Sequence, residues 1–495
     1  MIRSFCIQQN TLDYKEGKRT ITTKPLIALS LAICCGLSSC STSRADRPNI
    51  ILIMTDDQGW FDAGFNGNTA LRTPNLDHLA AEGIILDRFY SGSAVCSPTR
   101  ASVITGRNPL RIGIPDANSG HMKEEEITLP EILKEANYST GHFGKWHLGT
   151  LTRNTRDANR GGRENQQDHY SIPSMHGYDE YFCTESKVPC FDPMHYPVEF
   201  EEGESKKYGW KAREENEATL LYGTAYWTGV EKQVKHKLDG DDSKLIMDRA
   251  IPFIQKAAAD QKAFFTCIWI HTPHLPVVSD KLHRNYYDSM HIKKQIYYGA
   301  LTAMDEQVGR LWSALGELGI QEETMIWFCS DNGPEDNTPG SAGEFRKRKR
   351  SLYEGGVRVP AFVLWKNELE GGSRMDFPAV TSDYLPTILD ILDINYPDNR
   401  PLDGESIWSL LSGKQEKRVN PIGFVYKKRI SWVNNQYKLI SVNGGKSFEL
   451  YNLIKDRGEK EDLSSLEPEL VSEMKEELLI WMNSLENSEK GLDYR

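Results

Sequence analysis

Two pairs of oxygen-bearing side chains follow apolar runs of the chain. Asp56 and Asp57 come after one run, and Asp331 and Asn332 come after another. Three carboxylates and one amide oxygen form a hard donor set, which suits Ca²⁺ or Mg²⁺ better than Zn²⁺. A turn or a helix cap is the alternative for each pair taken alone. Because both pairs follow predicted buried strands, we expect a single metal site.

A cysteine opens a second motif, the run C-S-P-T-R-A-S-V-I-T-G-R from Cys96 to Arg107. Pro98 suits the first turn of a helix, so the sequence predicts Cys96 at a helix N-terminus, where backbone amides and the helix dipole favour an anion. The alternatives for a lone cysteine are a small buried hydrophobic residue and a thiolate nucleophile.

Basic and imidazole side chains form a third set. Lys145 and His147 lie two residues apart on a segment that we expect to be extended, so they point to the same side and suit contact with one anion. An exposed strand without function is the alternative. His271 and His274 follow a third apolar run, in the sequence H-T-P-H. These basic and imidazole side chains are therefore candidates to line the same site.

The elements that must position these residues alternate along the chain. Largely apolar segments predict strands buried on both faces of a sheet, at 49–54, 263–270, 325–329 and 359–365. Amphipathic stretches of helical period lie between them, such as the one that aligns Ile296, Ala300, Met304, Val308, Leu311 and Leu315. This alternation predicts an α/β fold with a mostly parallel sheet, whose sites form at the carboxyl ends of the strands.

The last part of the chain has a different pattern. Short strand-like pieces at 437–442 and 447–453 precede an amphipathic helix with Leu470, Met474, Leu478, Trp481, Met482 and Leu485 on one face. We therefore predict a catalytic domain over 46–413 and a small C-terminal α+β domain over 414–495.

Length and charge limit the possible functions. The chain has 495 residues and a formal net charge of −11, which argues against a general nucleic-acid binder. An anionic substrate must therefore meet a local cluster of positive side chains, and the basic run 346–350 is one candidate.

Residues 1–40 are predicted to be a lipoprotein signal peptide. The apolar run 25–37 has the length of a signal-peptide core, and Leu37-Ser38-Ser39-Cys40 resembles the bacterial lipobox, in which the cysteine is acylated. We expect export to the periplasm, outer membrane or cell surface, with membrane contact only through this lipid. A simple signal peptide or a buried helix is the alternative.

Five of the nine cysteines lie beyond this leader. Cys267 and Cys329 stand in apolar runs and are expected in the core. Cys183 and Cys190 are candidates for a disulfide in an oxidising compartment, although their spacing does not establish one. Cys96 is left over for chemistry.

Two of these motifs resemble the signatures of type I sulfatases, members of the alkaline phosphatase superfamily. The run from Cys96 resembles C-x-P-S/T-R followed by Thr-Gly-Arg, with Thr99 where serine is commonest. The segment 137–147 resembles G-Y-x-T-x-x-x-G-K-x-H, with Asn137 in place of the first glycine. Further resemblances extend over most of the mature chain, to 450–453.

The resemblance implies a fold and two cofactors. The fold is alkaline-phosphatase-like, with a large mixed, mostly parallel sheet between layers of helices. A separate formylglycine-generating enzyme would oxidise Cys96 to formylglycine, whose hydrated aldehyde attacks sulfur. The implied ion is Ca²⁺, and its ligands are Asp56, Asp57, Asp331, Asn332 and the modified residue 96.

The resemblance also implies roles for the remaining site residues. Arg100, Lys145 and Lys349 would neutralise the sulfate, and Arg348 or Arg350 would replace Lys349 if the register differs by one. Asp331 would help to deprotonate the attacking hydroxyl. His274, with Lys349, would protonate the departing alcohol, and His147 would take a proton as sulfate leaves. Ser186 would add a hydroxyl to the substrate site.

We expect the substrate to be a sulfated mono- or oligosaccharide. Trp210, Tyr222, Tyr226 and Trp227 are candidates for stacking on sugar faces at the rim, and burial in the core is the alternative. Two other functions are weighed against this one. The first is hydrolysis of phosphate or phosphonate esters within the same superfamily, and the second is a silent lipoprotein that binds sulfated glycans.

Overall fold

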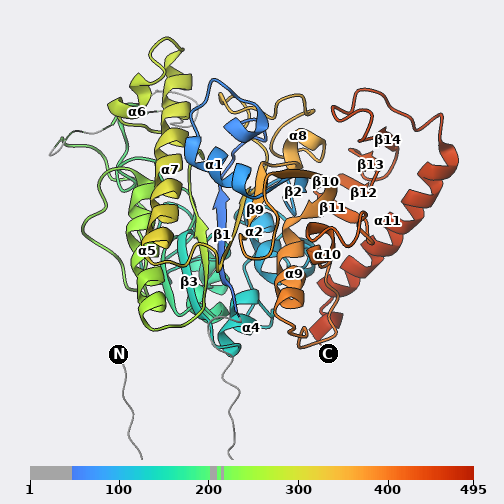
Figure 1. Cartoon of the computed structure of the whole chain (residues 1–495), viewed down its shortest axis with the longest axis horizontal. Coiled ribbons are helices and arrows are strands. Elements are labelled where there is room, and N and C mark those ends of the chain that lie inside the picture. The colour runs from blue at the N-terminus through green and yellow to red at the C-terminus, as the bar shows by residue number, and fades with distance from the viewer. Residues whose placement is uncertain (1–46, 201–208, 213, 215–216, 495) are drawn as a thin grey trace, which may run out of the picture. The chain divides into compact units, whose positions relative to one another are not determined.

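The first apolar run forms strand β1, Asn49–Thr55, and its seven residues are all buried. The computed structural model describes residues 47–200, 209–212, 214 and 217–494, and β1 lies inside its eight-stranded sheet (Figure 1). The strand order is β10-β2-β9-β8-β1-β7-β3-β4, in which β9 runs antiparallel to β2 and β8 and the other neighbours are parallel. The other strands of this sheet are β2 (Ile84–Tyr90), β3 (Ser139–Lys145), β4 (Glu180–Thr184), β7 (Phe264–Trp269), β8 (Thr324–Ser330), β9 (Ala361–Leu364) and β10 (Ser373–Val380).

The register of the central strands brings their carboxyl ends to one edge. Thr55 of β1 pairs with Ser330 of β8, and Met54 pairs with Trp269 of β7. Gly144 of β3 pairs with the same Trp269. The segments that follow these strands therefore start side by side.

Helices cover both faces of the sheet (Figure 1). Ile51 and Ile53 of β1 share one core with α1 (Pro74–Glu82), α5 (Asp242–Ala259) and α7 (Ile292–Glu317). Leu52 and Met54 share the other core with α2 (Cys96–Thr105), α4 (Leu129–Glu135), α9 (Tyr384–Ile391) and α10 (Trp408–Leu411). The predicted α/β class with a large mixed sheet between helices is confirmed.

The C-terminal region forms a four-stranded antiparallel sheet in the order β11-β12-β13-β14. Its strands are β11 (Ile422–Tyr426), β12 (Arg429–Val433), β13 (Tyr437–Ser441) and β14 (Glu449–Asn452), and α11 (Pro468–Glu489) packs on one face. The other face packs against Tyr90, Leu352 and Val357 of the catalytic region. The predicted small α+β region is confirmed, whereas its boundary after residue 413 stays a prediction, because the described residues belong to one compact unit.

The remaining short elements connect these layers. They are α3 (Pro109–Ile112), α6 (Lys281–Asn285), α8 (Glu354–Val357), β5 (Val198–Phe200) and β6 (Gly209–Lys211), with 3-10 turns at 64–66, 164–169, 173–176, 381–383 and 492–494. Among the described helices, none combines the length and the apolar character that a bilayer span requires. The predicted signal peptide 1–40 and its Cys40 lie outside the described residues.

Candidate active site

Asp56 and Asp57 leave β1 where Asp331 and Asn332 leave the neighbouring strand β8. The Asp57 amide donates to Asp331 Oδ1 at 3.1 Å, and Asn332 Nδ2 donates to Asp57 Oδ1 at 2.7 Å. All four residues are buried. Asp57 has a φ of 66°, a left-handed conformation that is costly for a non-glycine residue and is often retained at functional sites. The two strand ends thus form one cluster, as predicted.

Three oxygen atoms of this cluster are buried without a hydrogen-bond partner: Asp56 Oδ1, Asp57 Oδ2 and Asn332 Oδ1. Such atoms are costly unless a cation or a donor satisfies them. In the part of the chain that the structure describes, Asp56, Asp57, Cys96 and His274 each bring one ligand atom within 4.8 Å of the others. Carboxylate and amide oxygens fit a hard divalent cation such as Ca²⁺, so the residues present fit the implied ion.

Cys96 is the first residue of α2, and Val95 before it is extended. The Thr99 hydroxyl donates to the carbonyls of Ser93 and Val95, and the Ser97 hydroxyl donates to the carbonyl of His147 at 2.6 Å. These bonds fix the helix start against the neighbouring loop. Burial raises the pKa of the Cys96 thiol to about 12. The thiol is therefore neutral at physiological pH, which argues against the thiolate-nucleophile alternative.

Two fully buried cations lie directly behind Cys96. Arg100, one turn along α2, places Nη2 at 2.6 Å from Asp331 Oδ2 and 3.6 Å from Asp56 Oδ1. Lys145, the last residue of β3, donates to Asp56 Oδ2 at 2.6 Å. Although burial alone would raise the pKa of Asp56, Lys145, His274 and Arg100 hold it well below its usual range. Asp56 is therefore ionised and ready to bind a cation.

Glycine is required just before Lys145. Gly144 has a φ of +106°, and a Cβ atom there would lie 1.9 Å from the Trp269 carbonyl oxygen of β7. Only glycine combines this conformation with this approach. The glycine of the G-K-x-H motif thus allows β3 to end beside β7 with Lys145 next to Asp56.

Lys349 reaches the cluster from the loop before α8. Its Nζ contacts Asp57 Oδ1 and lies 3.5 Å from Cys96 Sγ and 3.6 Å from Glu335 Oε2. Arg350 instead pairs with Glu335. The Arg348 guanidinium donates to the backbone carbonyls of Glu335, Thr338 and Gly340. Lys349 is therefore the member of the basic run that lies beside Cys96.

His147 and His274 are both neutral side chains in this environment. Burial lowers the pKa of His147 well below its usual range, and Lys145 adds to the shift. Burial lowers the pKa of His274 to about 4, although Asp56 and Asp57 oppose the shift. His147 has a φ of 56°, so the chain turns there and does not stay extended as we expected. The alternation argument for Lys145 and His147 was therefore wrong at His147.

The hydrogen bonds of the two rings define their tautomers. His147 Nε2 lies 3.0 Å from Asn118 Oδ1, and His274 Nδ1 lies 2.6 Å from the Leu275 carbonyl oxygen. Both partners accept, so these nitrogens carry the hydrogen. Buried His147 Nδ1, which has no partner, and His274 Nε2, 3.7 Å from Asp57 Oδ2, are left to exchange protons.

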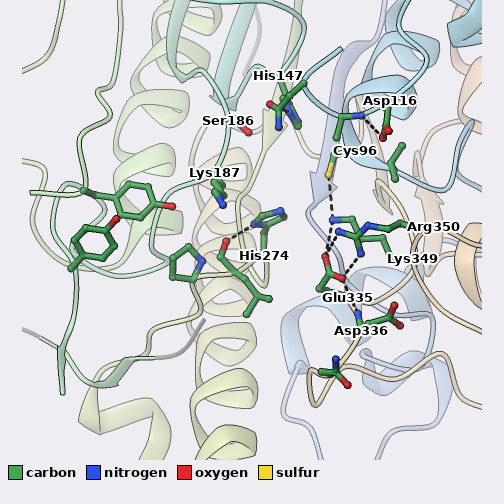
Figure 2. Close-up of a pocket in the computed structure, with 18 residues that line it drawn as sticks. Cys96, Asp116, His147, Ser186, Lys187, His274, Glu335, Asp336, Lys349 and Arg350 are labelled. Atoms are coloured by element: carbon green, nitrogen blue, oxygen red, sulfur yellow. Dashed lines mark hydrogen bonds and ion pairs between the residues drawn. The ribbon is translucent and has the colours of Figure 1, made fainter. Parts of the chain in front are cut away.

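A cavity of about 600 Å³ opens onto this cluster (Figure 2). Five predicted site residues line it, namely Cys96, His147, Ser186, His274 and Lys349. The other six lie behind its wall, namely Asp56, Asp57, Arg100, Lys145, Asp331 and Asn332. The structure thus brings all eleven together in two layers, one open to a substrate and one buried.

Lys187 also lines the cavity and was missed by the sequence reasoning. Its side chain is exposed and forms no ion pair with any described residue, and Figure 2 shows it beside Ser186. Although the residue is exposed to the cavity, partial desolvation by the surrounding protein lowers the pKa of Lys187, and the nearby cations Lys145 and Lys349 add to the shift. Its position directly after Ser186 was the only sequence signal available.

Two other expectations about the rim and the disulfide need correction. Tyr226 and Trp227 are fully buried, because they pack in the core, whereas Tyr222 lines the cavity. The side chain of Trp210 lies outside the described part. Cys183 and Cys190 are both buried, free thiols, so the candidate disulfide between them is not formed in the structure.

Comparison with known families matches most of the chain. The family model described as Sulfatase matches residues 48–394. A second model, described as N-sulphoglucosamine sulphohydrolase, C-terminal, matches residues 340–484. The two matches together extend from β1 to α11.

Individual proteins give the same result. N-acetylgalactosamine-6-sulfatase of Mus musculus is 31% identical over 391 residues, which cover 75% of this chain and 68% of that protein. Steryl-sulfatase of Mus musculus is 29% identical over 453 residues, which cover 78% of this chain and 69% of that protein. The crystal structure of Ps i-CgsB in complex with k-i-k-neocarrahexaose has a TM-score of 0.74 and 26% identity, covering 88% of this chain and 92% of that one.

Proposed function

The chain belongs to the sulfatase family and is a sulfatase, and we propose that it removes sulfate from a sulfated carbohydrate with a formylglycine made from Cys96 and a bound Ca²⁺. One observation carries this proposal. Cys96, Lys349 and His274 line the same cavity, beside buried carboxylate oxygens of Asp56 and Asp57 that lack a hydrogen-bond partner. This arrangement would bring a sulfate ester, the modified residue 96, a proton donor and a bound cation to one point.

The modified residue and the ion supply chemistry that the side chains lack. The formylglycine, as its hydrated aldehyde, would supply a hydroxyl nucleophile, and the ion would supply positive charge to the sulfate group. Asp56, Asp57, Asp331 and Asn332 would hold the ion with residue 96. Arg100 and Lys145 orient two of these carboxylates through the buried ion pairs at 2.6 Å.

Lys349 binds the sulfate in this proposal. Its Nζ lies 3.5 Å from Cys96 Sγ, so the ammonium contacts a sulfate group that approaches residue 96. Ser186 lines the same cavity and offers a hydroxyl. Preorganised donors of this kind stabilise charge that develops on the sulfate oxygens.

The two histidines move protons at defined atoms. His274 lines the cavity, and its Nε2 lies 3.7 Å from Asp57 Oδ2. In this proposal, Nε2 delivers a proton to the departing alcohol oxygen. Because burial keeps this ring neutral in the free protein, His274 would take up a proton from solvent when the anionic substrate binds, since the negative charge favours the imidazolium form. His147 Nδ1 is an unpartnered buried base and accepts a proton from residue 96 when sulfate departs.

The cavity lining favours a hydroxyl-rich substrate over a steroid. Away from Cys96, it carries mainly polar side chains: Asp116, Asn118, Lys187, Glu335, Asp336, Asn337 and Arg350. Tyr196 and Tyr222 add an edge-to-face pair with centroids 5.1 Å apart, which suits a sugar face. Among the similar proteins, one acts by its name on N-acetylgalactosamine 6-sulfate and another was solved with a neocarrahexaose. These observations support a sulfated saccharide.

We also propose export as a lipoprotein. The support is the apolar run that ends in Leu37-Ser38-Ser39-Cys40. A Cys40→Ala variant should leave the membrane fraction and keep its specific activity. A wild-type protein that is already soluble and begins at another residue would contradict this proposal.

A substrate panel tests the function directly. The protein, co-expressed with a formylglycine-generating enzyme, is assayed for sulfate release from defined sulfated mono- and oligosaccharides. 4-Nitrophenyl sulfate and matched phosphate and phosphonate esters complete the panel. We expect the highest kcat/KM on one sulfated saccharide. A preference for phosphate or phosphonate, or binding of sulfated glycans without turnover, would overturn the proposal.

A further inference from the structure

A cluster of buried charges lies where the C-terminal sheet meets the catalytic region. Lys438 of β13 is fully buried, with Nζ at 2.9 Å from Glu354 Oε1 and 3.0 Å from Glu459 Oε1. Glu459 also accepts the backbone amide of Glu354 at 2.7 Å. On the other side, Arg358 and the Tyr90 hydroxyl bond Glu354 Oε2 at 3.2 and 3.0 Å. Two carboxylates and two cations thus share one dry junction.

Stability alone is a weak reason for such a cluster. Burying a charge costs several kcal/mol, and well-packed hydrophobic residues often replace a buried ion pair without loss of stability. What charged groups add is a defined geometry, because each hydrogen bond is satisfied in only one arrangement. The position of Glu354 is therefore the property that this cluster fixes.

Glu354 is the first residue of α8, and α8 supports two loops of the active site. The Gly355 amide donates to the Arg346 carbonyl at 2.9 Å, and the Gly333 amide donates to the Gly356 carbonyl at 3.0 Å. A Cβ atom on Gly333 would lie 2.0 Å from the Gly355 carbonyl oxygen. One on Gly356 would lie 2.0 Å from the Ser351 carbonyl oxygen. Both loops therefore approach the backbone of α8 so closely that a side chain at Gly333 or Gly356 would not fit.

These two loops carry residues of the proposed sulfate and metal sites. Lys349 lies on the loop 346–353 before α8, and its amide donates at 3.1 Å to the Pro334 carbonyl of the loop 331–334 after β8. Asn332 lies on the loop after β8, and its Nδ2 donates to Asp57 Oδ1 at 2.7 Å. A displacement of α8 would therefore reach Lys349 through both loops.

We propose that Lys438 and Glu459 are positioning residues of the active site, which hold α8 and thereby set Lys349 against residue 96. The C-terminal region is then part of the catalytic apparatus. This inference rests on the proposed function, because it takes Lys349 as the residue that binds the sulfate.

A charge-balanced double variant tests the inference. Lys438→Met with Glu459→Gln removes one cation and one carboxylate and leaves Arg358 paired with Glu354. We expect kcat on 4-nitrophenyl sulfate to fall between about tenfold and a hundredfold in the folded protein, since small misplacements of a catalytic group have effects of this size. The same change in a Lys349→Ala background should alter kcat less than about twofold, because the residue that it positions is gone.

Arg111→Met with Asp403→Asn is the matched control. This largely buried pair has Arg111 Nε and Nη2 at 2.8 and 3.0 Å from the Asp403 carboxylate. It connects α3 with the C-terminal region through Ser488, and the hydrogen bonds that its two side chains make with described residues involve neither loop 331–334 nor loop 346–353. We expect a similar fall in Tm and less than about a twofold change in kcat. If the Lys438→Met/Glu459→Gln variant does not fold, Glu459→Gln alone keeps an acceptor for the Glu354 amide. It is then compared in the same way in the wild-type and Lys349→Ala backgrounds.

Two results would overturn the inference without touching the proposed function. One is a folded double variant with full kcat, and the other is a loss of the same size in the Lys349→Ala background. Full activity of the Lys349→Ala single variant would have a different meaning. It would remove Lys349 from the sulfate site of the proposed function and would remove this inference with it.

Discussion

Lys349 Nζ lies 3.5 Å from Cys96 Sγ, although the two residues are 253 positions apart in the chain. Burial raises the pKa of the Cys96 thiol to about 12, so the sulfur does not provide the negative charge that would pair with this ammonium. Asp57 and Glu335 contact Lys349 from the other side. The ammonium is therefore placed to meet an anion that approaches residue 96 from the cavity.

The first prediction concerns the modification of Cys96. Co-expression with a formylglycine-generating enzyme should convert Cys96 to the aldehyde, which peptide mass spectrometry detects. Cys96→Ser should lower kcat by at least about a thousandfold, because a single serine hydroxyl cannot replace the hydrated aldehyde. Its Tm should stay close to that of the wild type, since the side chains have similar size. A fully active preparation in which residue 96 is entirely a thiol would exclude the mechanism.

The second prediction concerns the metal. Ca²⁺ in excess should raise the Tm of the wild type, and a chelator should lower it, because an ion that binds only the folded state stabilises it by about 2.7 kcal/mol at a hundredfold excess over Kd. Asp331→Ala should remove this shift together with turnover.

Asp305→Asn is the control for the metal variant. Asp305 is also a buried carboxylate, but it accepts from the amides of Asn75 and Leu76 at the start of α1. This variant should lose stability and keep the full Ca²⁺-dependent shift in Tm. Full turnover of the wild type after verified removal of the metal would contradict the prediction.

The third prediction concerns Lys187, which has no ion-pair partner among the described residues and lines the cavity. We expect it to bind a second anionic group of the substrate. Lys187→Met should then lower kcat/KM about tenfold on a saccharide with a second sulfate or a carboxylate, the loss expected for one charge-assisted hydrogen bond. On a monosulfated neutral sugar, kcat/KM of the same variant should change less than about twofold. Equal losses on both substrates would assign Lys187 to the scissile sulfate instead.

Much of this site could be predicted from the sequence because regular structure has a period. The apolar runs before Asp56 and Asp331 form neighbouring parallel strands, and parallel strands end at the same edge. Pro98 similarly identifies the start of α2, where Cys96 lies. A residue directly after such an element is therefore placed by the element itself.

Irregular segments have no such period, and the sequence reasoning was limited there. The positive φ of His147 and the exposure of Lys187 depend on contacts with distant loops. The sequence permits Arg348 as an alternative to Lys349, and the bonds of the Arg348 guanidinium to backbone carbonyls exclude it. Tyr226 and Trp227 lie in the core. The sequence could not show this, because aromatic side chains are equally suited to a core and to a sugar-binding site.

The fourth prediction is a pH dependence of stability at His283. Its ring lies 2.8 Å from Asp280 and 3.2 Å from Glu306. Although burial alone would lower it, these carboxylates raise the pKa of His283 to about 9. The folded value is above the unfolded value of about 6.5, so the stabilisation is complete below about pH 6.5 and disappears as the pH rises through about 9.

His283→Gln isolates this contribution. Urea unfolding should show the variant less stable than the wild type by about 1 kcal/mol at pH 6, a size appropriate for partly solvated ion pairs. The two proteins should converge above about pH 9. A difference that grows between pH 6 and pH 10 would contradict the assignment. Sulfatase activity should not change, since His283 does not line the cavity.

The last prediction concerns His274 as the general acid. Its Nε2 lies 3.7 Å from Asp57 Oδ2, and its Nδ1 is occupied by the Leu275 carbonyl. Only Nε2 is therefore available to give a proton to a leaving oxygen. An alkoxide from a sugar is a poor leaving group, whereas nitrophenolate leaves without help, so protonation matters mainly for the sugar.

His274→Ala should accordingly lower kcat/KM by about a hundredfold or more on a sulfated sugar and by about tenfold or less on 4-nitrophenyl sulfate. The comparison of two substrates on one variant removes effects on folding and on metal binding, because both substrates use the same nucleophile and the same ion. His271→Asn is the matched control, since His271 is a buried histidine of the same segment that bonds Asp242 and Thr184 away from the cavity. Its losses should be equal on the two substrates. Equal losses for His274→Ala would remove His274 from the general-acid role and leave Lys349 as the group that faces the leaving oxygen.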